Sequence, residues 1–447
     1  MGKNVIEIQA QDYEKYVLQS DKPVILDFYS DECVPCEALA PKYEELSEIF
    51  GDKIVFLKMW RQKNRELALS LGVRSSPTLI FYQPRGKEVG KRLTGGIKKK
   101  EIIEQISNLI GEEEVKKRLS QKPKKRRDVD VIVLGGGPTG LTAGLYLAQA
   151  KLDTIIIDQD LPGGQVKITH MISNFPGTGG PISGWELGER MQKQVREAGA
   201  EIISAVDVTK VKLQPRDHVV WIDDDLEIHG KAIILAMGSE PRKLKVPGEE
   251  EYKGHGISYC ATCDGKYYEG KEVVVVGGGN SAVEESLFLT KFVNKVTIVH
   301  QFDHLQANKT AQEQAFQNPK IHFVWNSEPR AFEKLPDGRM KVTIENVKTK
   351  EYSDIITDGV FIFVGYVPNL SIIEEDLAKD KWGYLITDED MRTSIEGVFA
   401  AGDLRSKKYR QVTISVGEGT IAAMSCERYI AELNHELKKE KDLVLTK

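Results

Sequence analysis

Residues 129–158, VDVIVLGGGPTGLTAGLYLAQAKLDTIIID, decide the fold of the middle of this chain. Two apolar strand patterns enclose a helix pattern, and the turn Gly135-Gly136-Gly137-Pro138-Thr139-Gly140 fits G-x-G-x-x-G between the first strand and the helix. These glycines allow a tight turn and a close approach of the backbone, while the helix N-terminus faces a pyrophosphate. Asp158 ends the second strand, where a carboxylate can bind a ribose hydroxyl. The stretch therefore predicts a βαβ unit that binds an adenine dinucleotide.

The pattern recurs more weakly further along the chain. Val273 to Val276 and Val296 to Val299 read as strands around a helix from Ser281 to Phe292, and the turn Gly277-x-Gly279-x-x-Ala282 leads into that helix. A late strand ends in Ala400-Ala401-Gly402-Asp403. A second nucleotide-binding unit inserted within the first would explain this order, so a nicotinamide dinucleotide is the expected ligand of the second turn.

Composition bounds the remaining possibilities. The chain has 447 residues, of which 40% are hydrophobic and 29% charged, with a net charge of −5. This balance argues against a nucleic-acid binder or a membrane-surface protein. No run of about 18 apolar residues could span a membrane, and the N-terminus shows no apolar signal core. A cytoplasmic location is therefore expected.

Before the first glycine turn, residues 1–110 alternate strand and helix patterns. Val24 to Tyr29 and Thr78 to Tyr82 read as strands, and Cys36 to Phe50 and Lys99 to Leu109 as helices. The next residues are densely charged, without a persistent apolar face, and predict a solvated tether. The expected division of the chain is a domain at 1–110, a linker at 111–127, a discontinuous domain at 128–247 and 367–447, and an inserted domain at 248–366. Hinges are expected near 246–248 and 365–368.

Four of the five cysteines form two Cys-x-x-Cys pairs, Cys33–Cys36 and Cys260–Cys263. In a long chain without a secretion signal such pairs are catalytic or metal-binding. A zinc ribbon needs its two pairs about 12–20 residues apart, whereas 223 residues separate Cys36 from Cys260. No metal site is expected, and the fifth cysteine, Cys426, lies in an apolar helix pattern as a small hydrophobe.

Several motifs beyond the first turn appear in a specific order: Gly163-Gly164-Gln165, Asn174-Phe175-Pro176-Gly177, Cys260-Ala261-Thr262-Cys263-Asp264-Gly265, Gly277 to Ala282, and Gly397 to Asp403. Over residues 128 to about 432 this order resembles the low-molecular-weight thioredoxin reductases. The resemblance implies a homodimer with FAD at the first turn and a nicotinamide dinucleotide at the second. The implied FAD residues are Gly135, Gly137, Pro138, Gly140, Asp158, Gly164, Gln165, Asn174, Gly238, Gly402, Asp403, Arg410 and Gln411, and the implied residues of the second site are Gly277, Gly279, Asn280, Ser281 and Ala282.

The second site departs from that resemblance. The family carries arginines after the next strand that hold the 2′-phosphate of NADPH, but this chain reads His300-Gln301-Phe302-Asp303-His304-Leu305-Gln306 there. A dianionic phosphate needs paired cations, so NADPH is disfavoured. NADH stays open, with Asp303 as a ribose ligand, and so does a donor such as ferredoxin. His300 and His304 are expected to be solvated loop residues.

Residues 1–110 resemble thioredoxin, with Asp27, Cys33, Cys36, Pro41 and Ser76-Pro77-Thr78 in the family's order. A cysteine at a helix N-terminus has its thiolate favoured by backbone N–H groups, so Cys33 is the expected nucleophile and Cys36 the resolving thiol. The resemblance makes Pro77 a cis proline facing the pair and Asp27, with Lys58, a proton relay for Cys36. The rim differs, since Glu32 and Glu37 flank the pair. We expect a partner surface that is more basic than a generic thioredoxin target.

The sequence thus predicts an α/β protein with a thioredoxin fold followed by two Rossmann-like dinucleotide-binding domains. The resemblance makes Cys263 the flavin-proximal sulfur, Cys260 the interchange thiol and Asp264 the acid–base. Electrons would pass from FAD through Cys260–Cys263 to Cys33–Cys36, and on to an external disulfide protein or a peroxiredoxin-like acceptor. Alternatives are a peroxiredoxin reductase of the alkyl hydroperoxide flavoprotein type, a dithiol oxidase, a ferredoxin-dependent reductase, and an N-terminal domain that only docks.

Overall fold

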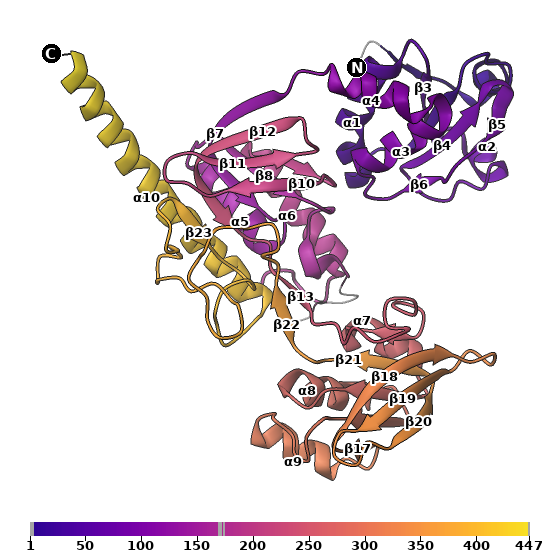
Figure 1. Ribbon diagram of the computed structural model, residues 1–447, viewed down its shortest axis with the longest axis vertical. Helices are drawn as coiled ribbons and strands as arrows, with labels where there is room; N and C mark the ends of the chain where they lie inside the picture. The colour runs from indigo at the N-terminus through magenta and orange to yellow at the C-terminus, as the bar shows by residue number, and fades with distance from the viewer. Residues whose placement is uncertain (1–3, 169–171, 173–174, 446–447) are drawn as a thin grey trace.

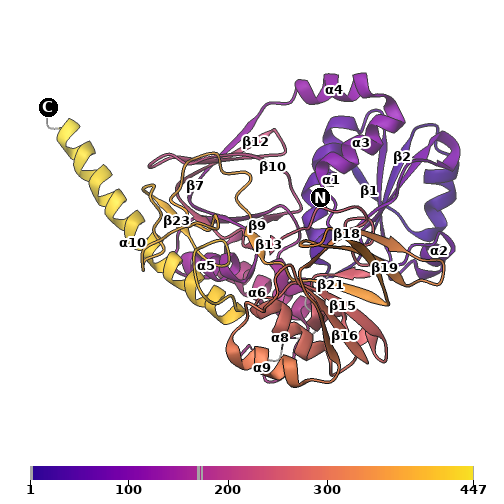
Figure 2. The same cartoon turned by 60° about the horizontal axis from the view of Figure 1, so that its bottom comes forward.

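The computed structural model describes residues 4–168, 172 and 175–445 and contains three folded domains (Figures 1 and 2). We call them the N-terminal domain (4–120), the central domain (125–238 and 369–445) and the inserted domain (242–365). Figure 1 shows the N-terminal domain beside the central domain, with the inserted domain below both. The predicted α/β class with two dinucleotide-binding units is confirmed.

The N-terminal domain is built on a six-stranded sheet of order β1-β3-β2-β4-β5, with β6 on β4. Val24 to Phe28 are buried, because helices cover both faces of the sheet and continuous apolar runs are typical of such strands. The strands are β1 Val5–Glu7, β2 Val24–Tyr29, β3 Val55–Trp60, β4 Thr78–Gln83, β5 Lys87–Glu88 and β6 Leu93–Thr94, and the α-helices are α1 Val34–Phe50, α2 Arg65–Ser70 and α3 Lys99–Ile110.

The segment predicted as a solvated tether instead contains helix α4 (Glu112–Ser120), packed on α3. Val115 is 2% exposed in the N-terminal core, the half-buried Leu119 packs against the same core, and Arg118 pairs with Asp52 at 2.6 Å. Acidic residues fill the first turn and basic residues the last, which suits the helix dipole. Val115 and Leu119 are the two apolar residues of this highly charged helix, and two are too few for a hydrophobic pattern to be recognised in the sequence.

The central domain holds a seven-stranded sheet of order β10-β11-β12-β7-β8-β9, with β23 paired to β12. Strand β23 aligns Val398 with Ile233, so the chain returns to the first sheet after the insertion. Helices α5 and α6 and the long C-terminal α10 complete the domain. The strands are β7 Lys125–Leu134, β8 Thr154–Asp158, β9 Glu201–Ser204, β10 Val208–Lys212, β11 His218–Ile222, β12 Leu226–Leu235 and β23 Val398–Ala400, and the helices are α5 Pro138–Gln149, α6 Gly184–Ala198 and α10 Val412–Leu445.

The inserted domain combines a five-stranded parallel sheet of order β14-β21-β15-β16-β17 with a three-stranded antiparallel sheet, β18-β19-β20. The two sheets share the core around Val274, Phe332 and Val360. The strands are β14 Ile257–Ser258, β15 Glu272–Val276, β16 Lys295–Val299, β17 Ile321–Val324, β18 Ser327–Lys334, β19 Met340–Asn346, β20 Tyr352–Thr357 and β21 Gly359–Ile362, and the helices are α7 Ala261–Asp264, α8 Asn280–Leu289 and α9 Lys309–Gln317.

Two short antiparallel strands, β13 (Ser239–Pro241) and β22 (Tyr366–Pro368), carry the chain between the central and inserted domains. The second crossing falls at the predicted hinge near 365–368. The first lies before the predicted 246–248, because Pro247 accepts a hydrogen bond from Phe332 N–H at 2.9 Å and Val246 packs in the inserted core. Within the described residues, no helix combines the length and apolarity that a membrane span needs.

Candidate functional site

The first glycine turn lies where the central sheet meets the N-terminus of α5. Gly135 has φ +112°, and a Cβ there would lie 2.4 Å from the Ala236 carbonyl oxygen, so only glycine fits. Gly137 is the N-cap of α5 and Pro138 its first residue, a position that suits proline because no N–H is needed there. A Cβ on Gly137 would meet nothing closer than 3.7 Å, which leaves the helix N-terminus open to a ligand.

Asp158 ends β8 beside this turn, as the sequence predicts. Its carboxylate accepts hydrogen bonds from Gly136 N–H at 2.7 Å and Asp160 N–H at 2.9 Å. Burial raises the pKa of Asp158 to about 6, although the two N–H donors oppose that shift. The carboxylate therefore braces the turn from the side where a ribose would lie.

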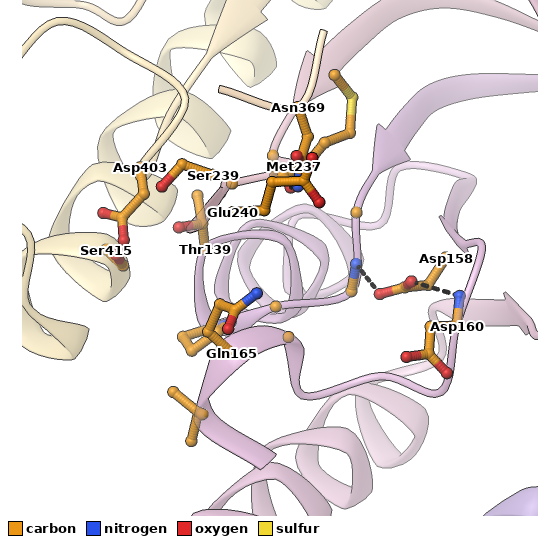
Figure 3. A pocket seen from close by; sticks show the side chains of 18 of the residues that line it. Thr139, Asp158, Asp160, Gln165, Met237, Ser239, Glu240, Asn369, Asp403 and Ser415 are labelled. Atoms are coloured by element: carbon orange, nitrogen blue, oxygen red, sulfur yellow. Dashed lines mark hydrogen bonds between the residues drawn. The ribbon is translucent and has the colours of Figure 1, made fainter. Parts of the chain in front are cut away.

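A cavity of about 690 Å³ opens over the turn, within the range for cofactor sites. Figure 3 shows Asp158 and Asp160 at one end of it and Asp403 and Ser415 at the other, with Gln165 below. Ten of the residues predicted for the first site line the cavity: Gly135, Gly137, Pro138, Asp158, Gly164, Gln165, Gly238, Asp403, Arg410 and Gln411. Gly140 and Gly402 support the wall from behind, since a Cβ on them would clash with Gly135 O and Thr139 Oγ1. Asn174 lies outside the described residues.

A buried charge cluster that the sequence analysis missed lies beneath Asp403. Glu418 on α10 accepts the Gly402 N–H at 2.7 Å and pairs with Arg405 at 2.7 Å and Lys407 at 3.2 Å. Lys407 also lies 3.0 Å from Asp403. These contacts fix the turn that carries Asp403. The sequence does show charged residues near the Ala-Gly-Asp turn. It does not show that Arg405 and Lys407 pair with Glu418 of helix α10, because that pairing leaves no sequence pattern.

Other missed residues follow strand ends. Met237 lies between β12 and β13, Ser239 and Glu240 begin β13, Asn369 follows β22, and all four line the cavity. The carboxyl ends of parallel strands are where ligands bind in α/β sheets. That rule, applied to the end of β12, could have found Met237 and Ser239 from the sequence.

The donor set fits an extended adenine dinucleotide such as FAD. The open helix N-terminus suits a pyrophosphate, and the carboxylates at the two ends suit ribose and polyol hydroxyls. Arg410 Nε is buried and has no hydrogen-bond partner among the described residues. Asp403 Oδ1 lies within ion-pair distance of Lys407 but accepts no hydrogen bond from any described residue. Both polar atoms are available to a ligand in the cavity.

The second glycine turn has the same local form. Gly277 has φ +130°, Gly279 is the N-cap of α8 with open space around it, and Ala282 is buried at the third position. Asn280 Oδ1 accepts the Asn308 N–H at 2.7 Å, which ties the turn to the start of α9. Of the five predicted residues, Gly279, Asn280 and Ser281 lie at the exposed or half-exposed mouth of the turn.

His300 corrects the expectation of a solvated loop histidine, because it is 4% exposed. Its ring occupies the space above Gly278, where a Cβ would lie 2.5 Å from the ring, and it packs edge-on against Phe302 at 5.3 Å. His304 is 68% exposed, as expected. A histidine can be buried here only because its neighbour is glycine, a tertiary contact that the sequence of the loop does not reveal.

No arginine from a distant segment reaches the 300–306 loop among the described ion pairs. One lysine does: Lys348 pairs with Asp303 at 3.0 Å, and His304 contacts the same carboxylate at 2.9 Å. Arg330 is engaged by Glu345 and Glu328. The expected ribose ligand Asp303 is thus already paired with a cation, and Lys348, the lysine that reaches the loop, is held by that acid.

The Cys33–Cys36 pair is a disulfide at the N-terminus of α1. Cys33 is the N-cap, and the Cys36 N–H donates to its sulfur at 3.2 Å. The Ser76–Pro77 peptide is cis, and Ser76 O lies 3.6 Å from Cys33 Sγ. Pro77 therefore lies beside the pair, and Pro41 is within α1. Backbone N–H groups and the helix dipole at this end favour a Cys33 thiolate.

Asp27 lies on β2, buried at 8% exposure, and its Oδ1 has no hydrogen-bond partner among the described residues. Burial raises the pKa of Asp27 to about 7, against the opposing charge of Lys58. Lys58 pairs with Glu7 at 3.7 Å rather than with Asp27. A carboxyl group with a pKa near neutrality can donate and accept a proton at physiological pH, which suits a proton relay.

The raised pKa of Asp27 predicts how the variant Asp27→Asn differs from the wild type in stability at different pH values. In the native state the Asp27 carboxyl group keeps its proton up to about pH 7. In the unfolded chain this group loses its proton near pH 3.8. The free energy of unfolding of the wild type therefore falls as pH rises between these values. At pH 9 the variant should gain up to about 4 kcal/mol over the wild type, and at pH 4 almost nothing. Native-state hydrogen exchange of the β2 amides measures this difference. Asp31→Asn, an exposed neighbour, is the control, and an equal gain at both pH values would contradict the assignment.

Cys260 precedes α7 in the inserted domain and is half-buried and disulfide-bonded. Its N–H donates to Ser258 Oγ at 3.1 Å, and its carbonyl accepts the Asp264 N–H at 3.2 Å. Asp264 therefore lies one helical turn from Cys260. The side chain of Cys263 lies outside the described residues. The buried Cys426 packs in the central core, and burial raises the pKa of its thiol far above the usual range.

Comparisons with known proteins agree with this architecture. The thioredoxin family matches residues 4–108, and the family described as pyridine nucleotide-disulphide oxidoreductase matches residues 129–419. A thioredoxin reductase of Peptoclostridium acidaminophilum is 44% identical over 315 residues, covering 69% of this chain and 98% of its own. A 34.2 kDa protein in the rubredoxin operon of Clostridium pasteurianum is 43% identical over 308 residues, covering 69% and 99%. The structure of Lactococcus lactis thioredoxin reductase in its FR conformation is 40% identical with a TM-score of 0.59, covering 68% and 99%.

The dithiol at the start of α1 lies within the segment that matches thioredoxin, and the dinucleotide cavity lies within the segment that matches the reductases. The second family match spans well over half of the chain, and its relatives are thioredoxin reductases along almost their whole length. The chain therefore belongs to the pyridine nucleotide-disulphide oxidoreductases, as a thioredoxin reductase-like enzyme that carries its own N-terminal thioredoxin domain.

Proposed function

We propose that this enzyme is an internal electron relay, in which Cys260–Cys263 reduces Cys33–Cys36 and the reduced thioredoxin domain then reduces external disulfides. Bound FAD would supply the two electrons that open the Cys260–Cys263 disulfide. The observation that carries the proposal is the presence of both a thioredoxin-type dithiol and a reductase-type Cys-x-x-Cys in one chain, each at a helix start.

The first transfer is thiol–disulfide exchange. The Cys260 thiolate would attack the Cys33–Cys36 disulfide to form a mixed disulfide. Cys263 would then attack Cys260, re-form the Cys260–Cys263 disulfide and release the reduced Cys33–Cys36 pair. Asp264, one turn from Cys260, is placed to hold a proton for the departing thiolate. Asp27 would do the same for Cys36. Since α7 and the N-terminal domain lie apart in Figure 1, this step requires the inserted domain to move about β13 and β22.

We infer that NADPH is a poor donor for this enzyme. The 300–306 loop offers no paired cations for a 2′-phosphate, Lys348, which reaches it from a distant segment, is held by Asp303, and His300 fills the space over Gly278. NADH or a redox protein such as ferredoxin is the alternative donor. The chemistry of the loop disfavours only the 2′-phosphate of NADPH, so it does not choose between NADH and a redox protein.

Anaerobic bleaching of the flavin separates the donors. NADPH at concentrations that saturate an ordinary site should bleach the flavin at least about tenfold more slowly than the physiological donor, since a lost charge pair costs about 1.4 kcal/mol or more. NADH and reduced ferredoxin are compared in parallel by stopped-flow absorbance. Rapid and complete bleaching by low NADPH would overturn the assignment of this loop.

We further propose that the enzyme is a homodimer through helix α10. Ile421 and Met424 are 40% and 47% exposed on one side of that helix, and Tyr146 on the adjoining α5 is 40% exposed. Such an apolar surface on neighbouring helices is typical of a subunit interface. Sedimentation of the full chain gives the oligomeric state, and Met424→Glu should shift it toward monomer.

A further inference from the structure

One face of the thioredoxin domain is bound to the central domain through a buried lysine. Lys42 on α1 is 6% exposed, and its ammonium group donates to Ile97 O at 3.1 Å within its own domain. It also donates across the domain boundary to Ser204 O at 3.0 Å and Ala205 O at 2.5 Å. A buried cation is stable only when such acceptors satisfy it. Both domains are therefore needed to complete this site.

Ion pairs surround Lys42 on the side away from the dithiol. Lys99, 4% exposed, contacts Asp225 of the central domain at 2.7 Å and Glu45 of α1 at 3.0 Å. Lys122 pairs with the same two carboxylates, and Lys98 pairs with Asp207 of the central domain at 2.7 Å. Lysines of the thioredoxin domain and acids of the central domain therefore face each other across one boundary.

The contact extends to the dithiol itself. Glu37, the residue after Cys36, pairs with Arg196 at the end of α6 at 2.5 Å. The glycine turn after β6 approaches the loop after β8, because a Cβ on Gly96 would lie 3.0 Å from Leu161. Figure 2 shows the N-terminal domain still against the central domain from this second direction. The expected basic partner of the acidic rim is thus present in the same chain, as Arg196.

The residues next to the disulfide have little exposed surface. Val34 and Cys36 are each 9% exposed, and Pro77 is buried, although all three flank the surface through which a thioredoxin-type dithiol meets other proteins. Helix α4 is packed on α3 rather than extended, so the covalent connection is short and does not pull the domain away.

We propose that the surface formed by Arg196, Leu161, the Ser204 and Ala205 carbonyls, Asp207 and Asp225 is a docking site for the redox face of the chain's own thioredoxin domain, in competition with external disulfide proteins. In the docked position these contacts hold the thioredoxin domain in one place on the central domain. Delivery to an external partner requires this surface to release Glu37 and the rim of the dithiol. The proposal rests on the proposed function only in taking Cys33–Cys36 as the delivering pair.

The test uses the full chain and dithiothreitol, which reduces the Cys33–Cys36 disulfide directly, so electrons from the flavin and Cys260 are not required. Dithiothreitol gives two electrons and two protons to the Cys33–Cys36 disulfide and becomes a cyclic disulfide, and the reduced pair then reduces insulin, whose precipitation is followed by turbidity. Arg196→Glu removes the ion pair from the central-domain side and leaves the thioredoxin domain unchanged. It should raise the rate roughly twofold to fivefold at low salt, the range for a partly exposed pair.

A double-mutant cycle with Glu37→Arg separates docking from a direct effect on the thiols. Each single variant should be faster than wild type, and the charge-swapped double variant should return to within about twofold of it. Arg190→Glu, on the same helix but paired with Glu186, should change nothing. Hydrogen exchange of residues 196–207 gives a second readout and should quicken in Arg196→Glu. An unchanged insulin rate in Arg196→Glu, or no coupling in the cycle, would refute the docking site and leave the relay untouched.

Discussion

Cys33→Ser should lower the turnover of external disulfides by roughly a thousandfold or more, while the flavin is still reduced by its donor at the wild-type rate. The reason is that Cys33 is the N-cap of α1, and its sulfur accepts the backbone N–H of Cys36 from the following turn. Serine keeps that geometry but has no accessible thiolate-like nucleophile at neutral pH. Without its nucleophile the thioredoxin domain cannot pass electrons to an external disulfide, so turnover should be lost rather than lowered by a small factor. Insulin reduction with the physiological donor measures the loss.

Two variants accompany Cys33→Ser. Cys426→Ala removes a thiol that is buried in the central core, far from either pair, and should leave turnover intact. Cys36→Ser keeps the nucleophile but removes the resolving thiol, so mixed disulfides with the acceptor should accumulate and be visible on non-reducing gels. If Cys33→Ser retained full turnover, the N-terminal domain would only dock, and Cys260–Cys263 would reduce the external acceptor directly.

Gly135→Ala and Gly137→Ala should both cost at least about a hundredfold in FAD affinity, but for different reasons. Alanine at 135 places a Cβ 2.4 Å from a backbone oxygen in a left-handed conformation, so the apoprotein itself should lose about 2–4 kcal/mol. Alanine at 137 meets nothing closer than 3.7 Å in the protein, so the apoprotein should keep its stability. Its methyl group instead occupies the space through which a pyrophosphate approaches the helix N-terminus.

Quenching of FAD fluorescence gives the affinity, and thermal unfolding of the apoprotein gives the stability. Gly199→Ala, after the end of α6 with open space around it, controls for the general cost of replacing a glycine of positive φ. Should Gly137→Ala bind FAD as tightly as the wild type, the ligand would not lie against the N-terminus of α5, and the cavity would have a different occupant.

The sequence predicted those parts of the enzyme that depend on local pattern. Strand β8, the glycine turns and the N-cap role of Cys33 follow from spacing alone, because each requires particular residue types within about 25 positions. Asp158 was found in this way. Contacts between distant segments were not predictable: Glu418 reaches Gly402 from another helix, and His300 is buried by the absence of a side chain on Gly278.

The same limit explains the misread linker. Helix α4 packs only Val115 and Leu119 against the core, and a hydrophobic pattern cannot be recognised from two residues in a charged stretch. Lys42 was equally hidden, because a lysine in an amphipathic helix reads as solvated until the neighbouring domain supplies the Ser204 and Ala205 carbonyls. The predictions thus failed where the environment of a residue comes from a segment distant in sequence, which for Lys42 belongs to another domain.

The pairing of β23 with β12 determines when the central domain can complete its fold during synthesis on the ribosome. Val398 lies opposite Ile233, so the central sheet stays incomplete until the whole inserted domain has been synthesised. The thioredoxin domain, continuous in sequence, can fold long before that, as domains do during synthesis. Its basic face, with Lys42, Lys98 and Lys99, then stands exposed for the time needed to translate about 300 residues, roughly 15–60 s at 5–20 residues per second. During synthesis the thioredoxin domain can therefore fold and stand free before the central domain of the reductase is complete.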